Sequence, residues 1–233
     1  MRRALLALAL LAPASAQAGP PFVTDDPQPT DLRKWEIYVF TALQHEPGAT
    51  SYAGGLDLNY GPFRDVQATV VVPLARQPGE RLAAGDVELA VKLKLLHQGQ
   101  GGSPVDLALF PRLFAPTAPG GPHAARILLP VWVQRSDGPW AVFGGGGYMR
   151  NPGAGQRDTW QGGMAVTRNL GTRVQLGVEY YGQGPDEIGG RPLHGINLGG
   201  SVKLGGPLSL LCSVGEAINR PQTIAYTALK FDF

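Results

Sequence analysis

The sequence is poor in cysteine, in charge and in long apolar runs. It contains one cysteine, Cys212, so no intramolecular disulfide can form. Charged residues make up 16% of the 233 residues, against about a quarter in an ordinary globular domain. After residue 18, no stretch reaches the roughly 18 to 20 continuous apolar residues of a membrane-spanning helix. The sequence therefore excludes a disulfide-stapled domain and a helical membrane protein.

The N-terminal residues have the layout of a secretory signal peptide. Arg2 and Arg3 precede an apolar run at 4–12, and Ala16-Gln17-Ala18 forms a small-residue cleavage site. We expect a signal peptide at 1–18. The chain has 20 basic and 18 acidic residues, so removing Arg2 and Arg3 leaves 18 of each sign. A neutral chain has no basic surplus for a nucleic acid, and we expect no such partner.

From residue 35 onward, apolar and polar residues alternate over stretches of about ten residues, separated by clusters of Gly, Pro, Asn and Asp. This pattern is typical of a transmembrane β-barrel, in which one strand face meets lipid and the other a polar interior. A secreted β-sandwich is the alternative, because its strands alternate too. We predict twelve strands, at 35–44, 52–60, 65–75, 86–97, 105–115, 125–136, 139–149, 159–168, 173–182, 194–204, 208–216 and 223–233. The predicted fold is all-β, a transmembrane antiparallel up-and-down barrel over 35–233, preceded by a periplasmic arm at 19–34.

The connections alternate between short and long, as expected of short periplasmic turns and longer outer loops. The predicted tight turns are 61–64, 137–138, 169–172 and 205–207, and the predicted longer connections are 45–51, 76–85, 116–123, 150–158 and 183–193. The connection at 98–104 is an exception, being long on the periplasmic side. Asp137-Gly138 predicts a two-residue hairpin turn. That turn would place Trp132 opposite Phe143 and Arg135 opposite Trp140.

Aromatic residues form two rows on the predicted lipid face. The periplasmic row is Trp35, Tyr60, Trp140, Phe231 and Phe233, and the outer row is Tyr52, Tyr148, Trp160 and Tyr180. Eight residues separate Tyr52 from Tyr60, which gives roughly 20 Å along the membrane normal for a tilted strand. This matches an apolar band of about 25 Å between two aromatic girdles. The rows favour the barrel over the sandwich and predict contact with outer-membrane lipid.

The C-terminal sequence Leu229-Lys230-Phe231-Asp232-Phe233 is an alternating strand that ends in phenylalanine. It resembles the signal by which the outer-membrane assembly machinery recognises its barrels. We therefore expect that machinery as a partner, and export by a Sec-type signal peptide to the bacterial outer membrane.

Several segments resemble one bacterial family. They are Gly19-Pro20-Pro21-Phe22-Val23-Thr24-Asp25-Asp26-Pro27, Asn59-Tyr60-Gly61-Pro62, Leu129-Pro130-Val131-Trp132, Gly138-Pro139-Trp140 and 144–148. The family is named for a role in the meta-pathway of phenol degradation, and its members are usually described as transporters or outer-membrane proteins. The resemblance covers most of the chain after the signal peptide and implies an outer-membrane β-barrel transporter.

Alternation also predicts which side chains face the barrel interior. The charged ones are Glu36, Asp57, Asp86, Glu88, Asp106, Glu179, Lys92, Lys94, Arg112, Arg126, Lys203 and Lys230, and the aromatic ones are Tyr38, Phe40, Phe110, Phe114, Trp132, Phe143 and Tyr181. The charges either form a constriction of mixed sign or fill a small barrel with ion pairs. The aromatic residues either bind an amphipathic or aromatic ligand or stiffen the barrel by packing. The candidate lumen and ligand residues are Phe110, Arg112, Phe114, Arg126, Trp132, Phe143, Glu88, Lys92 and Tyr181.

The arm at 19–34 carries three aspartates, Asp25, Asp26 and Asp31, and should lie at the periplasmic mouth. It is either a tether or a plug that folds into the lumen. The aspartates fall short of the ligand count of a calcium site. The glycine run at 144–147 lacks the lysine and the following helix of a phosphate loop. No metal or cofactor is expected.

None of the four histidines stands two residues from a serine, as a dyad on one strand face would require. We therefore expect no catalytic residues and no enzyme. The predicted function is an outer-membrane channel or facilitator for a small-molecule solute, aromatic or hydrophobic in character. The alternatives are a structural or adhesion barrel that transports nothing and a lipid-modifying enzyme.

Overall fold

The computed structural model describes residues 21–233, except residues 77, 80 and 118–123. The predicted signal peptide at 1–18 lies outside the described residues. The described part of the chain contains no apolar helix of membrane-spanning length. Its strands are β1 (Trp35–Glu46), β2 (Ala49–Phe63), β3 (Val66–Arg76), β4 (Ala83–Ala84), β5 (Val87–Leu96), β6 (Asp106–Leu109), β7 (Arg112–Ala115), β8 (Arg126–Asp137), β9 (Trp140–Arg150), β10 (Thr159–Leu170), β11 (Val174–Gln183), β12 (Leu193–Gly205), β13 (Leu208–Ala217) and β14 (Thr223–Asp232).

These segments form twelve barrel strands, two of which are interrupted. β4 and β5 both pair with β3 and are separated only by a short irregularity, so they act as one strand. β6 and β7 both pair with β5 and with β8, and the break between them falls at Phe110 and Pro111. A proline in a sheet interrupts the ladder because it has no N–H to donate.

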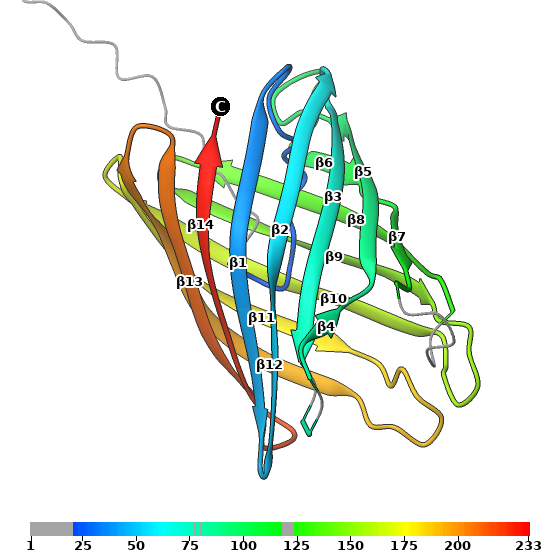
Figure 1. Ribbon diagram of the computed structural model, residues 1–233. Helices are drawn as coiled ribbons and strands as arrows, with labels where there is room; N and C mark the ends of the chain where they lie inside the picture. Colours follow the sequence, from blue (N-terminus) through cyan, green and yellow to red (C-terminus); the bar gives the residue numbers. More distant parts are fainter. Residues whose placement is uncertain (1–20, 77, 80, 118–123) are drawn as a thin grey trace, which may run out of the picture.

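The barrel is closed, because β1 pairs with β14 as well as with β2. Every pairing between these named strands is antiparallel, and neighbours in the sheet follow one another along the chain (Figure 1). The predicted twelve-stranded antiparallel barrel is therefore confirmed.

Alternation places apolar side chains outside and polar ones inside. Leu129 on β8, Met164 on β10 and Leu198 on β12 all point outward and are more than half exposed. Lumen-facing polar residues such as Gln67 and Glu179 are buried. This arrangement is the reverse of a soluble domain and is the one that a transmembrane barrel requires.

Several hairpins differ from the sequence predictions. The turn predicted at 61–64 consists of Arg64 and Asp65, because Phe63 pairs with Val66. The predicted long connection at 45–51 is wrong, because Glu46 pairs with Ala49 and the turn consists of Pro47 and Gly48. Gly48 has a φ of 81°, which glycine adopts without a steric penalty. The outer end of this hairpin is therefore short.

The predicted register of the hairpin between β8 and β9 is also wrong. Asp137 pairs with Trp140, so the turn residues are Gly138 and Pro139. Trp132 consequently lies opposite Gly145, and Arg135 lies opposite Val142. Proline suits the turn because its φ is fixed and it cannot donate to a ladder, and Gly138 supplies the positive φ of 54°. The shift is two residues, so each side chain keeps its predicted face.

The aromatic residues of the two predicted rows lie on the outer surface, where Tyr60 and Phe231 are half-buried and the other seven are exposed. Trp35 packs on Tyr60 with ring centroids 4.7 Å apart. Tyr148 packs edge-on against Trp160 at 5.3 Å. Each pair joins directly opposed positions on neighbouring strands. Their contact with lipid headgroups stays a prediction.

Candidate functional site

The arm, defined here as residues 21–34, lies inside the barrel (Figure 1). Its middle is the most enclosed part, with Asp26 fully buried and Thr24 2% exposed. The arm has no helical or strand periodicity, and the barrel wall supplies the partners of its backbone. Because those partners come from distant strands, the arm crosses the lumen and contacts opposite sides of the wall.

Glu179 on β11 binds the first part of the arm. Its carboxylate accepts hydrogen bonds from the backbone N–H of Val23, at 3.0 Å, and from that of Thr24. Asn197 Nδ2 donates a third bond at 3.1 Å. Glu179 is 1% exposed and has no ion-pair partner in the described part of the chain. A buried carboxylate is costly unless donors surround it, so two of the three groups that satisfy Glu179 belong to the arm.

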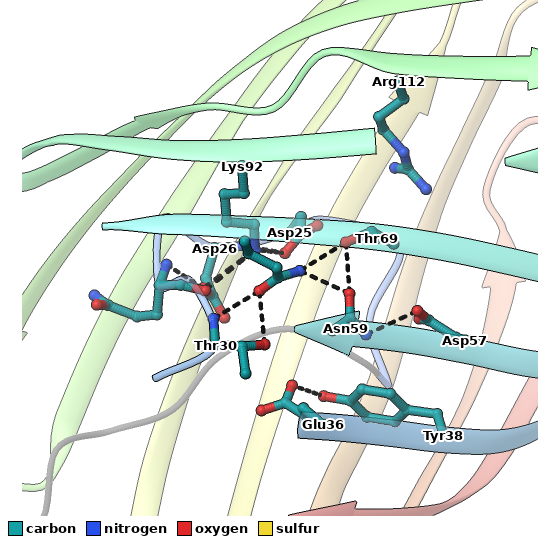
Figure 2. A network of polar contacts seen from close by, with 12 residues as sticks. Asp25, Asp26, Thr30, Glu36, Tyr38, Asp57, Asn59, Thr69, Lys92 and Arg112 are labelled. Atoms are coloured by element: carbon teal, nitrogen blue, oxygen red, sulfur yellow. Dashed lines mark hydrogen bonds and ion pairs between the residues drawn. The ribbon is translucent and has the colours of Figure 1, made fainter. Parts of the chain in front are cut away.

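Lys92 on β5 binds the middle of the arm from the other side. Its ammonium lies 3.0 Å from Asp25 Oδ1 and 3.8 Å from Asp26 Oδ1, and the lysine is 4% exposed (Figure 2). Beside this pair, Gln28 donates to Asp106 at 2.9 Å and accepts from Lys94 at 2.6 Å.

The last part of the arm meets a polar cluster on β2 and β3. Gln67 Oε1 accepts hydrogen bonds from Thr30 N, at 2.7 Å, and from Thr30 Oγ1, at 3.0 Å. Gln67 Nε2 donates to Asn59 and to Thr69, and Asn59 donates to Asp57 (Figure 2). At the rim, the Arg33 N–H donates to the Gly61 carbonyl at 2.6 Å. A Cβ at position 61 would lie 2.1 Å from the Asp31 carbonyl oxygen, so glycine is required for this close approach.

Asp26 has an unusual pKa for an aspartate. Burial raises the pKa of its carboxyl to about 7, and the nearby Asp25 adds to the rise while Lys92 opposes it. Its Oδ1 accepts from the Gln28 N–H at 2.6 Å. Its Oδ2 has no hydrogen-bond partner among the described residues. A carboxyl with one free oxygen in a buried position is suited to carry a proton near neutral pH.

The structure brings most of the predicted candidate residues together along one side of the lumen. Lys92 lies 4.8 Å from the centre of the Phe110 ring, and Arg112 lies 5.3 Å from the Phe110 ring and 5.5 Å from the Phe114 ring. Arg126 lies 5.1 Å from the Phe114 ring. We call these five residues the cation–aromatic ladder.

Acidic residues accompany the ladder. Glu88 forms two hydrogen bonds with Arg112, at 2.7 and 2.8 Å, and Asp86 pairs with Arg126 at 2.9 Å. Trp132 is buried behind the ladder, in one cluster with Phe110 and Ala90.

Two candidates lie away from the ladder. Phe143 faces the arm, with its ring centre 6.3 Å from that of Phe22. Tyr181 lies against Gly195, where a Cβ would be 2.4 Å from the phenol oxygen. Alternation correctly placed all the candidate residues on the lumen face. Which of them lie in the ladder and which lie away from it depends on the path of the arm.

The remaining interior charges are mostly paired. Lys230 lies 2.9 Å from Glu36 and 3.2 Å from Asp232, and Lys94 lies 2.9 Å from Asp106. Lys203 is exposed at the mouth and has no ion pair in the described part of the chain. Of the two alternatives for the interior charges, the ion-pair network fits this arrangement better than a constriction of free charges.

Two of the cavities that border the arm, both lined by described residues, bear on function. The first, of about 140 Å³, lies between the arm and the wall and is lined by Asp25, Asp57, Glu88, Lys92, Phe110 and Arg112 among others. The second, of about 420 Å³, opens at the end of the barrel opposite the C-terminus, and Phe22 and Val23 of the arm contribute to its lining.

Sequence reasoning missed the second cavity, which we call the vestibule. Its wall includes the inward-facing Ala42, Ala53 and Ala75 on β1, β2 and β3, together with Tyr226 on β14. Small residues at inward positions of adjacent strands leave space in a barrel whose interior is otherwise filled. The alanines at these inward positions are the signal in the sequence, and neither charge nor aromatic character marks them.

Comparison with solved structures identifies the fold. An outer-membrane channel from Pseudomonas putida F1 matches with a TM-score of 0.72 and 13% identity, over 89% of this chain and 98% of that one. The NanC porin matches with a TM-score of 0.62 and 8% identity, over 84% and 98%. The KdgM porin, solved in complex with oligogalacturonate, matches with a TM-score of 0.60 and 10% identity, over 85% and 99%. The fold is that of outer-membrane β-barrels.

No family model matches the chain, and no curated protein matches it. The resemblance to the phenol-degradation family therefore stays a prediction. At these identities the solved structures establish the barrel architecture, and the solute must be argued from the residues of this chain.

Proposed function

We propose that this protein is a channel of the bacterial outer membrane that admits small molecules and is held closed by its own N-terminal arm. One observation carries the proposal. The arm lies across the lumen of a barrel with a channel fold, and polar contacts to Glu179, Lys92 and Gln67 bind it there. Such contacts are modest in net free energy, because water replaces them when the arm leaves. A plug held in this way can be displaced without unfolding the barrel.

The lining of the vestibule supports a proposal for the solute class. Its lining includes Phe22, Val23, Ala53, Ile224 and Tyr226, so most of its surface is apolar, with Gln44, Ser51, Asn197 and Ser213 among the polar groups. An apolar pocket with few polar groups suits a small ligand that is largely hydrophobic or aromatic. We infer that solutes of this kind collect in the vestibule and pass when the arm moves.

A transport role is favoured over the other two classes. An adhesion barrel needs an outer surface for its partner, and the hairpin between β1 and β2 ends in a two-residue turn. For a lipid-modifying enzyme, the lipid-facing surface would have to present a nucleophile with an activating base. His194, on the outer face, instead shares a hydrogen bond with Tyr180 at 2.9 Å. We therefore propose no catalytic role.

The test is the ionic conductance of the full chain in a planar lipid bilayer. Glu179→Ala removes the acceptor of two arm N–H groups, so we expect longer open times and a higher mean conductance than in the wild type. Glu216→Ala is the matched control, because Glu216 is an exposed acid that contacts Thr223 and not the arm. A Glu179→Ala barrel that inserts and stays electrically silent would refute the channel.

A further inference from the structure

The cation–aromatic ladder combines cationic groups with aromatic rings, and this combination matches one chemical class of solute. Arg126, Arg112 and Lys92 are cationic, and the rings of Phe114 and Phe110 lie between them at cation–π distance. An aromatic carboxylate carries both complementary features, a ring for the phenylalanines and an anionic group for the cations. The ladder extends from Arg126, at the start of β8, to Lys92, which touches the arm.

Lys92 differs from the two arginines in where its acidic partners come from. Glu88 and Asp86, which pair with Arg112 and Arg126, belong to the barrel wall or directly adjoin it. The partners of Lys92 are Asp25 and Asp26 of the arm. Glu88 also holds Arg112 through two parallel hydrogen bonds, which a single incoming carboxylate cannot easily replace. Lys92 is therefore the position where a solute carboxylate can take the place of an arm carboxylate.

The cavity of about 140 Å³ lies at this end of the ladder. Lys92, Phe110 and Arg112 line it on the wall side, and Asp25 lines it on the arm side. Glu36 and Asp57, from β1 and β2, add two further carboxyl groups to its lining. An extra anion would be repelled, but exchanging Asp25 for a solute carboxylate leaves the number of charges unchanged. Binding and arm displacement are coupled for this electrostatic reason.

We propose that the ladder binds small aromatic carboxylates and that the bound carboxylate replaces Asp25 at Lys92, which loosens the arm. This inference rests on the proposed channel function and adds to it a solute class and an opening signal. A neutral aromatic compound lacks the group that competes with Asp25. An aliphatic carboxylate lacks the ring that packs on Phe110.

Binding is tested on the purified full chain with benzoate as the probe, by titration calorimetry in detergent. Benzyl alcohol and cyclohexanecarboxylate are the matched probes without the charge and without the aromatic ring. We expect benzoate to bind more tightly than either, and Lys92→Gln to weaken benzoate binding by about tenfold or more, as the loss of a charged hydrogen bond implies. Lys203→Gln, which removes an exposed lysine away from the ladder, should change nothing. Equal affinities for the three probes, or an unchanged affinity in Lys92→Gln, would overturn the proposal.

Arm displacement is tested by thiol labelling. Thr24→Cys in a Cys212→Ser background places the single thiol at a buried arm position. Benzoate should accelerate its labelling, whereas benzyl alcohol should not, and adding Lys92→Gln should remove the benzoate effect. If benzoate binds but labelling stays slow, the coupling to the arm is wrong. If Glu179→Ala conducts while benzoate fails to bind, the channel stands and the solute class fails.

Discussion

Trp35 and Phe233 exchange backbone hydrogen bonds and so join the first barrel strand to the end of the last. The Trp35 N–H donates to the Phe233 carbonyl at 3.2 Å, and the Phe233 N–H donates to the Trp35 carbonyl at 3.0 Å. The side chain of Phe233 contributes little to this closure, because it points outward and stacks on Phe231 with centroids 6.3 Å apart. Its backbone closes the barrel, while its ring stays accessible.

This arrangement predicts that Phe233→Ala impairs assembly without impairing stability. In cells, the fraction of protein that reaches the folded, heat-modifiable form should fall, because the assembly machinery would lose the terminal ring. The purified protein refolded in detergent should unfold within about 0.5 kcal/mol of the wild type, as for an ordinary surface substitution. Phe63→Ala, at another exposed phenylalanine, is the control and should assemble normally. Equal assembly of both variants would argue against recognition of the C-terminal strand.

A second prediction concerns Gln67, which links the arm to the wall. Gln67→Ala leaves the Thr30 N–H without its buried acceptor and removes one of the two donors to Asn59 Oδ1, so the free energy of unfolding should fall by about 1–3 kcal/mol. Urea unfolding in detergent micelles measures this change. Gln44→Ala removes an exposed glutamine that bonds only weakly to Glu46, at 3.4 Å, and should cost far less.

The same link can be isolated with a double substitution. Thr30→Val removes the hydroxyl that donates to Gln67. The costs of Thr30→Val and Gln67→Ala should be less than additive in the double variant, because both break one shared contact. Full additivity would mean that the arm and the wall are energetically independent at this point.

The wall and the arm differ in how far the sequence predicts them. The strand positions could be predicted from alternation, because successive side chains of a barrel strand face lipid and lumen in turn. The same period assigned Lys92, Phe110 and Arg112 to the lumen. Their mutual contacts required the register between strands, and the proline turn at Gly138 and Pro139 shows how a two-residue error arises without changing any face.

The arm has no periodic pattern of apolar and polar residues, so the sequence does not predict where it lies. Its partners are also remote in sequence, since Val23 bonds to Glu179 across 156 residues. A plug and a tether have the same composition, and only the wall residues opposite the arm distinguish them. A buried glutamate without a basic partner, such as Glu179, becomes informative only once the three-dimensional neighbours are known.

A third prediction concerns the pH response of an outer loop. The hydrogen bond from the Tyr148 hydroxyl at 2.6 Å, the Asn151 N–H at 2.9 Å and the Arg150 guanidinium lower the pKa of Asp158 to about 2. A lowered pKa in the folded state means that the stabilisation is present above the usual value of 3.8 and is lost as the pH falls from there through about 2.

Hydrogen exchange at the Asn151 amide measures this response. After correction for the intrinsic rate, protection in the wild type should decline between about pH 4 and 2. Asp158→Asn should show weak protection with no such decline, and Asp186→Asn should behave like the wild type in this range. A decline that persists in Asp158→Asn would mean that another carboxylate controls the loop.

The last prediction is that the arm binds more weakly as the pH rises. The pKa of Asp26 is about 7 in the docked arm and should return to the usual 3.8 when the arm is in water. A group with a raised acid pKa favours the docked state in its protonated form, so docking is strongest below about pH 4 and weakens progressively up to about pH 7. Above that pH the arm does not weaken further, because Asp26 is ionised in both states.

Mean conductance in a bilayer should therefore increase from pH 5 to pH 8. Asp26→Asn should conduct equally at both, while Asp31→Asn, which alters an exposed arm aspartate, should keep the increase. If Asp26→Asn retained the full pH dependence, the proton would have to act elsewhere in the lumen.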